Sequence, residues 1–311
     1  MNPFPYTADN KQYHTYAYFL KQKYGGRVAR VPLDAGFTCP NRDGTKGTGG
    51  CAFCSPRGSG DQVVGGMDLS AQYAAGIAKL QKWPNARYIP YLQAFSGTYA
   101  PIERLRAVYD QALTLPGAVG LAVATRADCI DEERAALLSS YAEKTDLTVE
   151  LGLQTIHDRT AQAMGRGETF ADFTRAVGLL REKGISVWAH LINGLPGETR
   201  EMMVQSAAVL GQMDVQGVKI HLLHYLRGTR LAGLSHLAMP QDAYVKTVCD
   251  QLEVLPGRMV IGRLTGDGPA DLLLAPLWSR RKRETLNAID RELARRDSFQ
   301  GKRLEAGRDT K

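Results

Sequence analysis

The sequence lacks the features that mark membrane and secreted proteins. No apolar run approaches the roughly eighteen residues that a membrane-spanning helix needs, and residues 1–5 are not part of a basic region followed by an apolar stretch. Five cysteines are an odd number in a long chain without a secretion signal, so a disulfide framework is not expected. We therefore expect a cytoplasmic protein, with no membrane association, that uses cysteine for a metal or redox site.

The sequence also lacks internal repeats, low-complexity blocks and proline-rich linkers. A hydrophobic content of 44% over 311 residues is enough for one large α/β domain with a real core. We expect a core domain over residues 28–265, an N-terminal helical extension over residues 1–27 and a basic C-terminal extension over residues 266–311.

Positive charge is concentrated at the C-terminal end of the chain. Residues 280–311 hold eleven Lys and Arg against six Asp and Glu, which gives +5 of the formal net charge of +7. The run Arg280-Arg281-Lys282-Arg283 is compatible with a polyanionic partner such as RNA. A solvated surface helix and tail would explain the same charge.

Strand-like apolar runs alternate with helical patterns along the chain. The runs begin near Val28, Tyr88, Ala118, Leu147, Ser186, Gly217 and Arg258. Helix start signals follow several of them, at Asp68 or Ser70, Pro101 and Asp131. Such alternation predicts parallel β-structure, and six or seven units are fewer than a complete eightfold barrel needs. We expect an α/β fold with a partial (β/α)6 barrel similar to a TIM barrel.

The loop from Gly36 to Gly66 carries the strongest chemical signal. Eleven residues separate Cys39 from Cys51, and two separate Cys51 from Cys54. Soft thiolate ligands select iron-sulfur clusters or zinc, and loops at the carboxyl ends of parallel strands build the functional sites of α/β folds. Three thiolates can hold a cluster and leave one iron open, whereas a structural zinc site needs four ligands.

Two alternatives remain open for these cysteines. One is a zinc knuckle completed by a distant histidine, and the other is a Cys-x-x-Cys thiol redox pair. The zinc alternative corresponds to a non-catalytic, zinc-stabilised nucleic-acid-binding protein.

Further segments carry a resemblance to a known family. Residues 149–173, which include Val-Glu-Leu-Gly-Leu-Gln and Met-Gly-Arg-Gly-Glu-Thr-Phe, resemble the fourth-strand motif of radical S-adenosylmethionine (SAM) enzymes related to the elongator catalytic subunit and the coproporphyrinogen dehydrogenases. Residues 190–199, His-Leu-Ile-Asn-Gly-Leu-Pro-Gly-Glu-Thr, resemble the fifth-strand motif. With the long cysteine spacing, the chain is similar nearly end to end to a small bacterial branch of that family.

The resemblance implies a fold, two cofactors and a reaction. The fold is the partial barrel of radical SAM enzymes, and the cofactors are a 4Fe-4S cluster held by Cys39, Cys51 and Cys54 and SAM. Some members of the branch are understood to convert 5-carboxymethylaminomethyluridine at the tRNA wobble position to 5-aminomethyluridine. The implied partners are tRNA, an electron donor such as flavodoxin or ferredoxin, and a downstream methyltransferase. The same radical core could instead act on a small molecule or a protein.

The resemblance also suggests site residues. Gln154 would contact the SAM ribose and Arg166 the SAM carboxylate, and the alternative for Arg166 is a surface ion pair. The remaining SAM contacts are expected from Gln93 and Ser96 after the second strand, although this chain departs there from the family's Gly-Gly-Glu pattern, and from Asn193 and Gly194 in a tight turn near the adenine.

Three residues at strand positions are candidates for direct catalytic roles. Glu150 shares a strand face with Gln154 by alternation and could meet the ribose or a substrate amine, or it could be a buried acid paired with a basic residue. His190 and His221 are candidates for substrate binding or proton transfer, and His224 lies close to the same rim. Arg126 and Asp128 after the third strand could line the substrate pocket or pair with each other.

Overall fold

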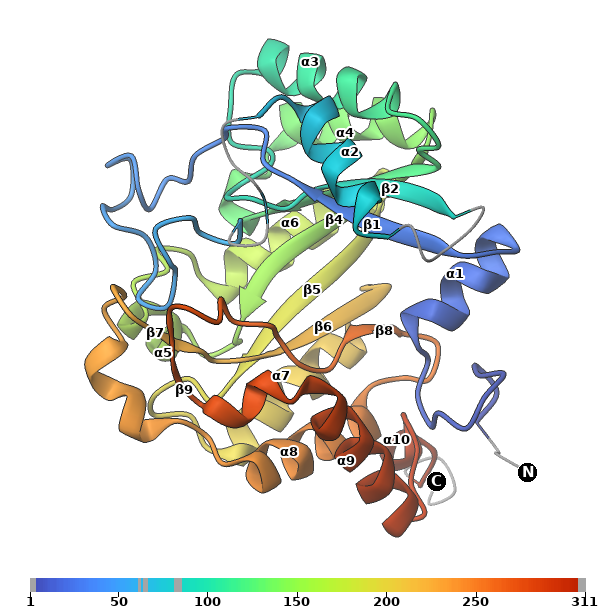
Figure 1. Cartoon of the computed structure of the whole chain (residues 1–311), viewed down its shortest axis with the longest axis vertical. Coiled ribbons are helices and arrows are strands. Elements are labelled where there is room, and N and C mark those ends of the chain that lie inside the picture. The colour runs from blue at the N-terminus through green and yellow to red at the C-terminus, as the bar shows by residue number, and fades with distance from the viewer. Residues whose placement is uncertain (1–3, 61–62, 64–66, 81–85, 307–311) are drawn as a thin grey trace. The chain divides into compact units, whose positions relative to one another are not determined.

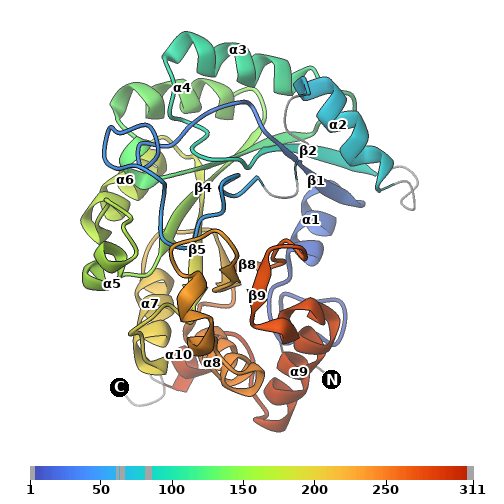
Figure 2. The same ribbon diagram turned by 60° about the vertical axis from the view of Figure 1, so that its left-hand side comes forward.

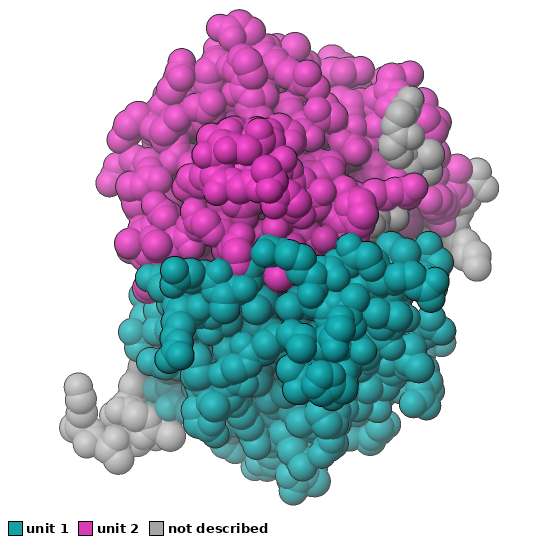
Figure 3. All heavy atoms as spheres, turned by 90° about the vertical axis from the view of Figure 1, so that its left-hand side faces the viewer, with its two compact units in different colours: residues 1–19, 154–164, 189–311 teal, residues 20–153, 165–188 magenta. Residues whose placement is uncertain are grey.

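The computed structural model describes residues 4–60, 63, 67–80 and 86–306, which form two compact units. One unit contains residues 20–153 and 165–188, and we call it the cysteine-loop unit. The other contains residues 1–19, 154–164 and 189–311, and we call it the histidine unit; Figure 3 colours the two separately. The sequence analysis expected a core domain with two terminal extensions, bounded at residues 27 and 265. These boundaries do not coincide with those of the two compact units, and the expected division stays a prediction.

The strands confirm the predicted parallel α/β architecture. Seven strands form one sheet in the order β1-β2-β3-β4-β5-β6-β8, namely β1 (Val28–Leu33), β2 (Arg87–Leu92), β3 (Gly120–Thr125), β4 (Asp146–Gln154), β5 (Ser186–Asn193), β6 (Gly217–Leu222) and β8 (Val260–Arg263). β1 with β2, β2 with β3, β3 with β4 and β6 with β8 pair in parallel. A separate antiparallel pair joins β7 (Tyr225–Leu226) to β9 (Leu273–Ala275). All seven main strands begin within three residues of the predicted starts.

Helices follow the strands, and local capping explains where several begin. The α-helices are α1 (Tyr16–Tyr24), α2 (Leu69–Ala78), α3 (Ile102–Leu113), α4 (Glu132–Ala142), α5 (Asp158–Ala163), α6 (Phe170–Glu182), α7 (Arg200–Gln212), α8 (Gln241–Val254), α9 (Lys282–Arg295) and α10 (Lys302–Ala306). The Asp68 side chain accepts from the Ala71 amide, and Asp131 does the same for Arg134. Pro101 directly precedes α3. The start signals predicted at these three residues are therefore confirmed.

Each unit has its own core. In the cysteine-loop unit, α3 and α4 lie side by side over the sheet in both ribbon views (Figures 1 and 2), and the rings of Tyr109 and Tyr141 meet edge to face at 5.3 Å between them. In the histidine unit, α8 packs against both α7 and α9. There, the backbone amide of His14 donates to the Gln300 side chain at 2.8 Å, which ties the N-terminal segment to the C-terminal one. In the part of the chain that the structure describes, no helix combines the length and apolar character of a membrane span.

Candidate functional site

The cysteine loop is folded by its own backbone. Cys39, Cys51 and Cys54 are free thiols, and Cys51 is buried. The Cys54 amide donates to the Cys51 carbonyl at 3.0 Å, and the Gly50 amide donates to the Asn41 carbonyl at 2.8 Å. Gly50 has φ +81°, and a Cβ there would lie 3.0 Å from the Arg42 side chain. Glycine is therefore required for the turn that leads into the last two cysteines.

The surroundings of the thiols suit negatively charged sulfur. The Asn41 amide points at Cys51 Sγ at 3.5 Å. A hydrogen bond from Cys54 lowers the pKa of Cys51 to about 5, and the nearby guanidinium groups of Arg166 and Arg126 lower it further against the effect of burial. The same thiol hydrogen bond, together with burial, raises the pKa of Cys54.

This donor set fits a 4Fe-4S cluster. Three free thiols can ligate a cluster, and an amide donor to sulfur with two nearby cations suits its negative charge. Among the described residues, no three His, Cys, Asp or Glu side chains are grouped as ligands of a single metal ion. Assignment of the three cysteines to the cluster therefore rests on the thiols and their surroundings.

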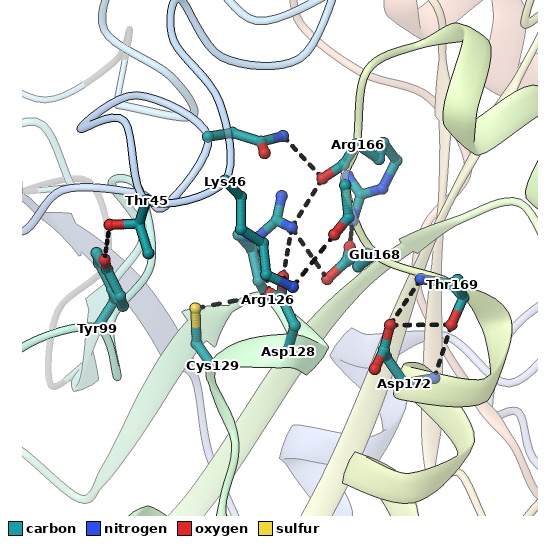
Figure 4. A network of polar contacts seen from close by, with 12 residues as sticks. Thr45, Lys46, Tyr99, Arg126, Asp128, Cys129, Arg166, Glu168, Thr169 and Asp172 are labelled. Atoms are coloured by element: carbon teal, nitrogen blue, oxygen red, sulfur yellow. Dashed lines mark hydrogen bonds and ion pairs between the residues drawn. The ribbon is translucent and has the colours of Figure 1, made fainter.

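A buried ionic network lies beside the loop (Figure 4). Arg126 grips Asp128 through a fork, with Nε to Oδ1 at 2.8 Å and Nη2 to Oδ2 at 2.7 Å, and Lys46 lies 2.7 Å from the same Oδ2. Burial alone would raise the pKa of Asp128, but the pairing with Arg126 and Lys46 holds that pKa below its ordinary value. The pairing of Arg126 with Asp128, which the sequence analysis left open, is therefore present.

Arg166 belongs to this network and is buried. Its side chain pairs with Glu168 and donates to the Gly152 carbonyl, while its Nε is buried without a hydrogen-bond partner. Only 4% of Arg166 is exposed, which excludes the alternative of a surface ion pair. Burial lowers the pKa of Arg166. An unpartnered donor on a buried guanidinium suits a carboxylate ligand, and the predicted contact with SAM stays a proposal.

Glu150 is fully buried and paired. It accepts a hydrogen bond from Tyr91 at 2.5 Å and forms an ion pair with Arg30. The Arg30 guanidinium also lies over the rings of Trp188, at 5.0 Å, and Tyr91, at 5.3 Å. The contacts of Glu150 therefore match the alternative of a buried acid paired with a basic residue. A catalytic role for Glu150 stays a prediction.

The segment after β2 adopts a constrained conformation. Gln93 Nε2 donates to the Ser59 carbonyl at 2.7 Å, so this side chain supports the cysteine loop. Phe95 has φ +59°, which is strained for a residue with a side chain. Ser96 is fully buried beside the Cys129 thiol. The roles of Gln93 and Ser96 toward SAM stay predictions.

The other candidate residues lie in the histidine unit. Gln154 ends β4 with φ +71°, a conformation that is uncommon for non-glycine residues and is enriched at functional sites. Asn193 exchanges two hydrogen bonds of 2.8 Å with Gln251, so its amide is committed to the core. Gly194 has φ +86°, as the predicted tight turn requires. The rings of His190 and His221 lie 5.1 Å apart.

The structure also points to residues that sequence reasoning missed. Glu198 accepts from Thr155 at 2.5 Å, and burial raises its pKa. Glu198 lies in the segment 190–199 that resembles the fifth-strand motif, and this motif was the sequence signal that could have identified it. Asn41 stands in the cysteine loop, but only the fold shows that its amide reaches sulfur. Arg263 gave no signal beyond a charged residue in an apolar strand.

The basic run at the C-terminus is mostly engaged in local contacts. Arg280 donates to the Ala270 carbonyl at 2.7 Å, Arg281 pairs with Glu284 at 3.2 Å and Lys282 pairs with Asp267 at 2.6 Å. These contacts lessen the case for a phosphate-binding strip. Arg308 and Lys311, which contribute to the tail's charge, lie outside the described residues.

Comparison with known proteins identifies the family. The Radical SAM superfamily matches residues 42–210, and the Radical SAM C-terminal domain matches residues 215–295. The Bacillus subtilis protein YtqA, itself uncharacterized, is 46% identical over 307 residues, which cover 97% of this chain and 95% of YtqA. A tRNA uridine(34) acetyltransferase of Methanocaldococcus jannaschii is 27% identical over 164 residues, or 50% of this chain and 30% of that protein.

A solved structure supports the fold. The archaeal Methanocaldococcus infernus Elp3 superposes with a TM-score of 0.60 at 19% identity, over 84% of this chain and 63% of that one. The chain belongs to the radical SAM superfamily. It is a radical SAM enzyme with the partial barrel of that family, and its cofactors are a 4Fe-4S cluster and SAM. The alternative of a non-catalytic zinc protein is therefore wrong.

Proposed function

We propose that this radical SAM enzyme modifies the wobble uridine of tRNA by converting 5-carboxymethylaminomethyluridine to 5-aminomethyluridine. The observation that carries the substrate class is the similarity to tRNA uridine(34) acetyltransferases over half of the chain, together with the Elp3 fold over 84% of it. The acetyltransferases are named for the same tRNA position. An electron donor such as flavodoxin or ferredoxin, and a methyltransferase that uses the product, complete the proposal.

The residues divide into binding and positioning roles in this proposal. Cys39, Cys51 and Cys54 hold the cluster, which when bound supplies the electron that cleaves SAM. The buried guanidinium of Arg166, whose Nε has no hydrogen-bond partner, would bind the SAM carboxylate. Gln154, whose backbone has φ +71°, would contact the SAM ribose. Asn41 donates to cysteine sulfur and so tunes the cluster.

The test is anaerobic. The reconstituted, reduced enzyme is incubated with SAM and tRNA that bears 5-carboxymethylaminomethyluridine, and the digested nucleosides are analysed by mass spectrometry. The proposal predicts 5-aminomethyluridine, together with 5′-deoxyadenosine. If 5′-deoxyadenosine forms while the tRNA stays unchanged, the radical chemistry stands and the substrate is a small molecule or a protein.

The chain offers matched controls for the cluster. Cys54→Ala should lose both cluster iron and 5′-deoxyadenosine. Cys129→Ser and Cys249→Ser should keep both, because burial raises the pKa of each of these thiols to about 12 and leaves them protonated. Retention of a full cluster in Cys54→Ala would overturn the ligand assignment.

A further inference from the structure

A cluster of basic side chains lies on β6 and at the end of β8 in the histidine unit. Its members are Lys219, His221, His224 and Arg263, and His190 joins it from β5 through its 5.1 Å ring contact with His221. Lys219 and His221 stand two residues apart on β6 and share one strand face, while Val218 and Ile220 on the opposite face are fully buried. Charged residues on a strand inside an α/β fold need a structural or functional reason.

An irregularity in β8 brings Arg263 into the cluster. Val218 pairs with Ile261, but the next residue of β6, Lys219, pairs with Arg263. Gly262 is therefore the extra residue of a bulge. A bulge of one residue redirects the side chain that follows, and it is a common device beside active sites. Without it, Gly262 would stand opposite Lys219.

The histidine rings are closely packed and lack partners at one nitrogen. Nε2 of His221 and Nε2 of His224 are both buried without a hydrogen-bond partner among the described residues. The loop after β8 approaches the rings so closely that a Cβ at Gly266 would lie 3.1 Å from His224 Cε1 and 3.7 Å from His221 Nδ1. Buried polar atoms without partners are rare, and two in one cluster indicate a ligand that supplies the missing bonds.

Arg263 brings a positive charge to the cluster. The charge of Arg263 contributes to lowering the pKa of both His221 and His224, so its guanidinium lies near both rings. No carboxylate pairs with Arg263 in the described part of the chain. The charge of Asp267 raises the pKa of His224, but this carboxylate is already paired with Lys282, 2.6 Å from its Nζ. A guanidinium with two imidazole donors can satisfy the oxygens of one carboxylate.

We propose that Arg263, His221 and His224 form an anion subsite for the carboxylate of the substrate's carboxymethylamino group. The identity of that substrate rests on the function proposed above, whereas the anion subsite rests on the cluster itself. The subsite recognises the substrate by the group that the reaction removes, so the aminomethyl product loses its anchor. A partly buried cluster with two buried ring nitrogens suits a small carboxylate better than the backbone phosphates of a tRNA.

Binding of two nucleosides tests the subsite directly. The SAM-loaded holoenzyme is titrated with 5-carboxymethylaminomethyluridine and with 5-aminomethyluridine, which lacks the carboxylate. We expect the carboxylate-bearing nucleoside to bind about tenfold more tightly or better, the size of a charge-assisted hydrogen bond. Arg263→Gln should abolish this preference, and Arg263→Lys should restore part of it. Arg258→Gln, at an exposed residue just before β8, should leave it unchanged.

The outcomes separate this inference from the proposed function. Equal binding of both nucleosides by the wild type, or a preference that survives Arg263→Gln in a folded variant, would overturn the subsite. Loss of SAM affinity in Arg263→Gln would also overturn it, because the cluster would then hold the SAM carboxylate. If the wild type leaves tRNA unmodified but keeps an Arg263-dependent preference for the carboxylate, the proposed function fails and the subsite stands.

Discussion

The Asn41 side chain donates a hydrogen bond of 2.7 Å to the carbonyl of Arg166. The same amide nitrogen lies 2.8 Å from the Gly165 carbonyl and 3.5 Å from Cys51 Sγ. One side chain thus connects the cysteine loop to the segment that carries the buried arginine. The position of the thiols and that of the guanidinium are coupled through it within the cysteine-loop unit.

Replacement of Asn41 tests this coupling. Asn41→Ala removes the donor to sulfur and to two backbone carbonyls, so we expect roughly 1–3 kcal/mol of lost stability and a lower cluster reduction potential, because fewer hydrogen bonds reach the sulfur. Urea unfolding and redox titration followed by electron paramagnetic resonance measure the two effects. Thr45→Val, which removes a loop hydroxyl 2.8 Å from Tyr99, should leave the potential unchanged. An unaltered potential in Asn41→Ala would contradict the assigned contact.

The Asp128 carboxylate should contribute to stability in a pH-dependent way. Asp128→Asn leaves the buried Arg126 without its bidentate carboxylate partner, so we expect the free energy of unfolding to fall by about 3 kcal/mol at pH 7. Because ion pairs hold the pKa of Asp128 below its ordinary value of 3.8, this contribution is present above pH 3.8 and is lost as the pH falls through the lowered pKa.

Urea unfolding of both proteins from pH 7 to pH 3 measures this difference. The difference in unfolding free energy between the wild type and Asp128→Asn should narrow below pH 4. Asp242→Asn is the control, because its carboxylate is 73% exposed and lies 3.5 Å from Lys246, and it should cost less than about 1 kcal/mol at any of these pH values. A gap that stays constant down to pH 3 would count against the pairing.

Arg30 stabilises the charge on Glu150. Arg30→Met should leave a fully buried carboxylate without its cation and cost about 3–5 kcal/mol, whereas Arg30→Met with Glu150→Gln should recover a substantial part of this loss. Thermal or urea unfolding of the two single variants and the double variant gives the coupling energy. Additive effects would show that the two side chains do not interact.

Much of the fold could be predicted from the sequence because its signals are local. Alternating strand and helix patterns and cap residues such as Asp68 and Asp131 depend on neighbours within a few positions, and they located all seven main strands. The cysteine loop was equally visible, since its spacing is contiguous in the chain.

The missed residues depend on contacts between distant segments. The Arg30–Glu150 ion pair joins residues 120 positions apart. A lone glycine such as Gly262 is compatible with a bulge, but only the strand pairing shows that Arg263 stands opposite Lys219. Asn193 shows the converse. Its place in a recognisable motif suggested a cofactor contact, which stays a prediction, but nothing in the motif showed that its amide binds Gln251, 58 residues away. Pairing of polar side chains is decided by the tertiary fold, which local patterns do not encode.

The histidine cluster should make stability rise with pH. Burial lowers the pKa of His224 from 6.5 to about 4. The charge of Asp267 opposes this shift, and the charge of Arg263 adds to it. Burial, with the positive charges of Lys219 and Arg263 and the neighbouring His190 and His224, lowers the pKa of His221. Between pH 4 and 6.5 the unfolded chain therefore binds more protons than the folded one, and the free energy of unfolding increases with pH over that window.

His224→Gln tests this dependence and the anion subsite together. The variant should flatten the rise in unfolding free energy between pH 4 and 7, by at most about 3 kcal/mol, while His236→Gln, at an exposed histidine, should leave the slope unchanged. A carboxylate bound to the cluster adds a negative charge, so it should raise both histidine pKa values and flatten the wild-type slope. Urea unfolding with and without 5-carboxymethylaminomethyluridine measures this change. A wild-type slope that does not respond to the nucleoside would show that its carboxylate binds elsewhere.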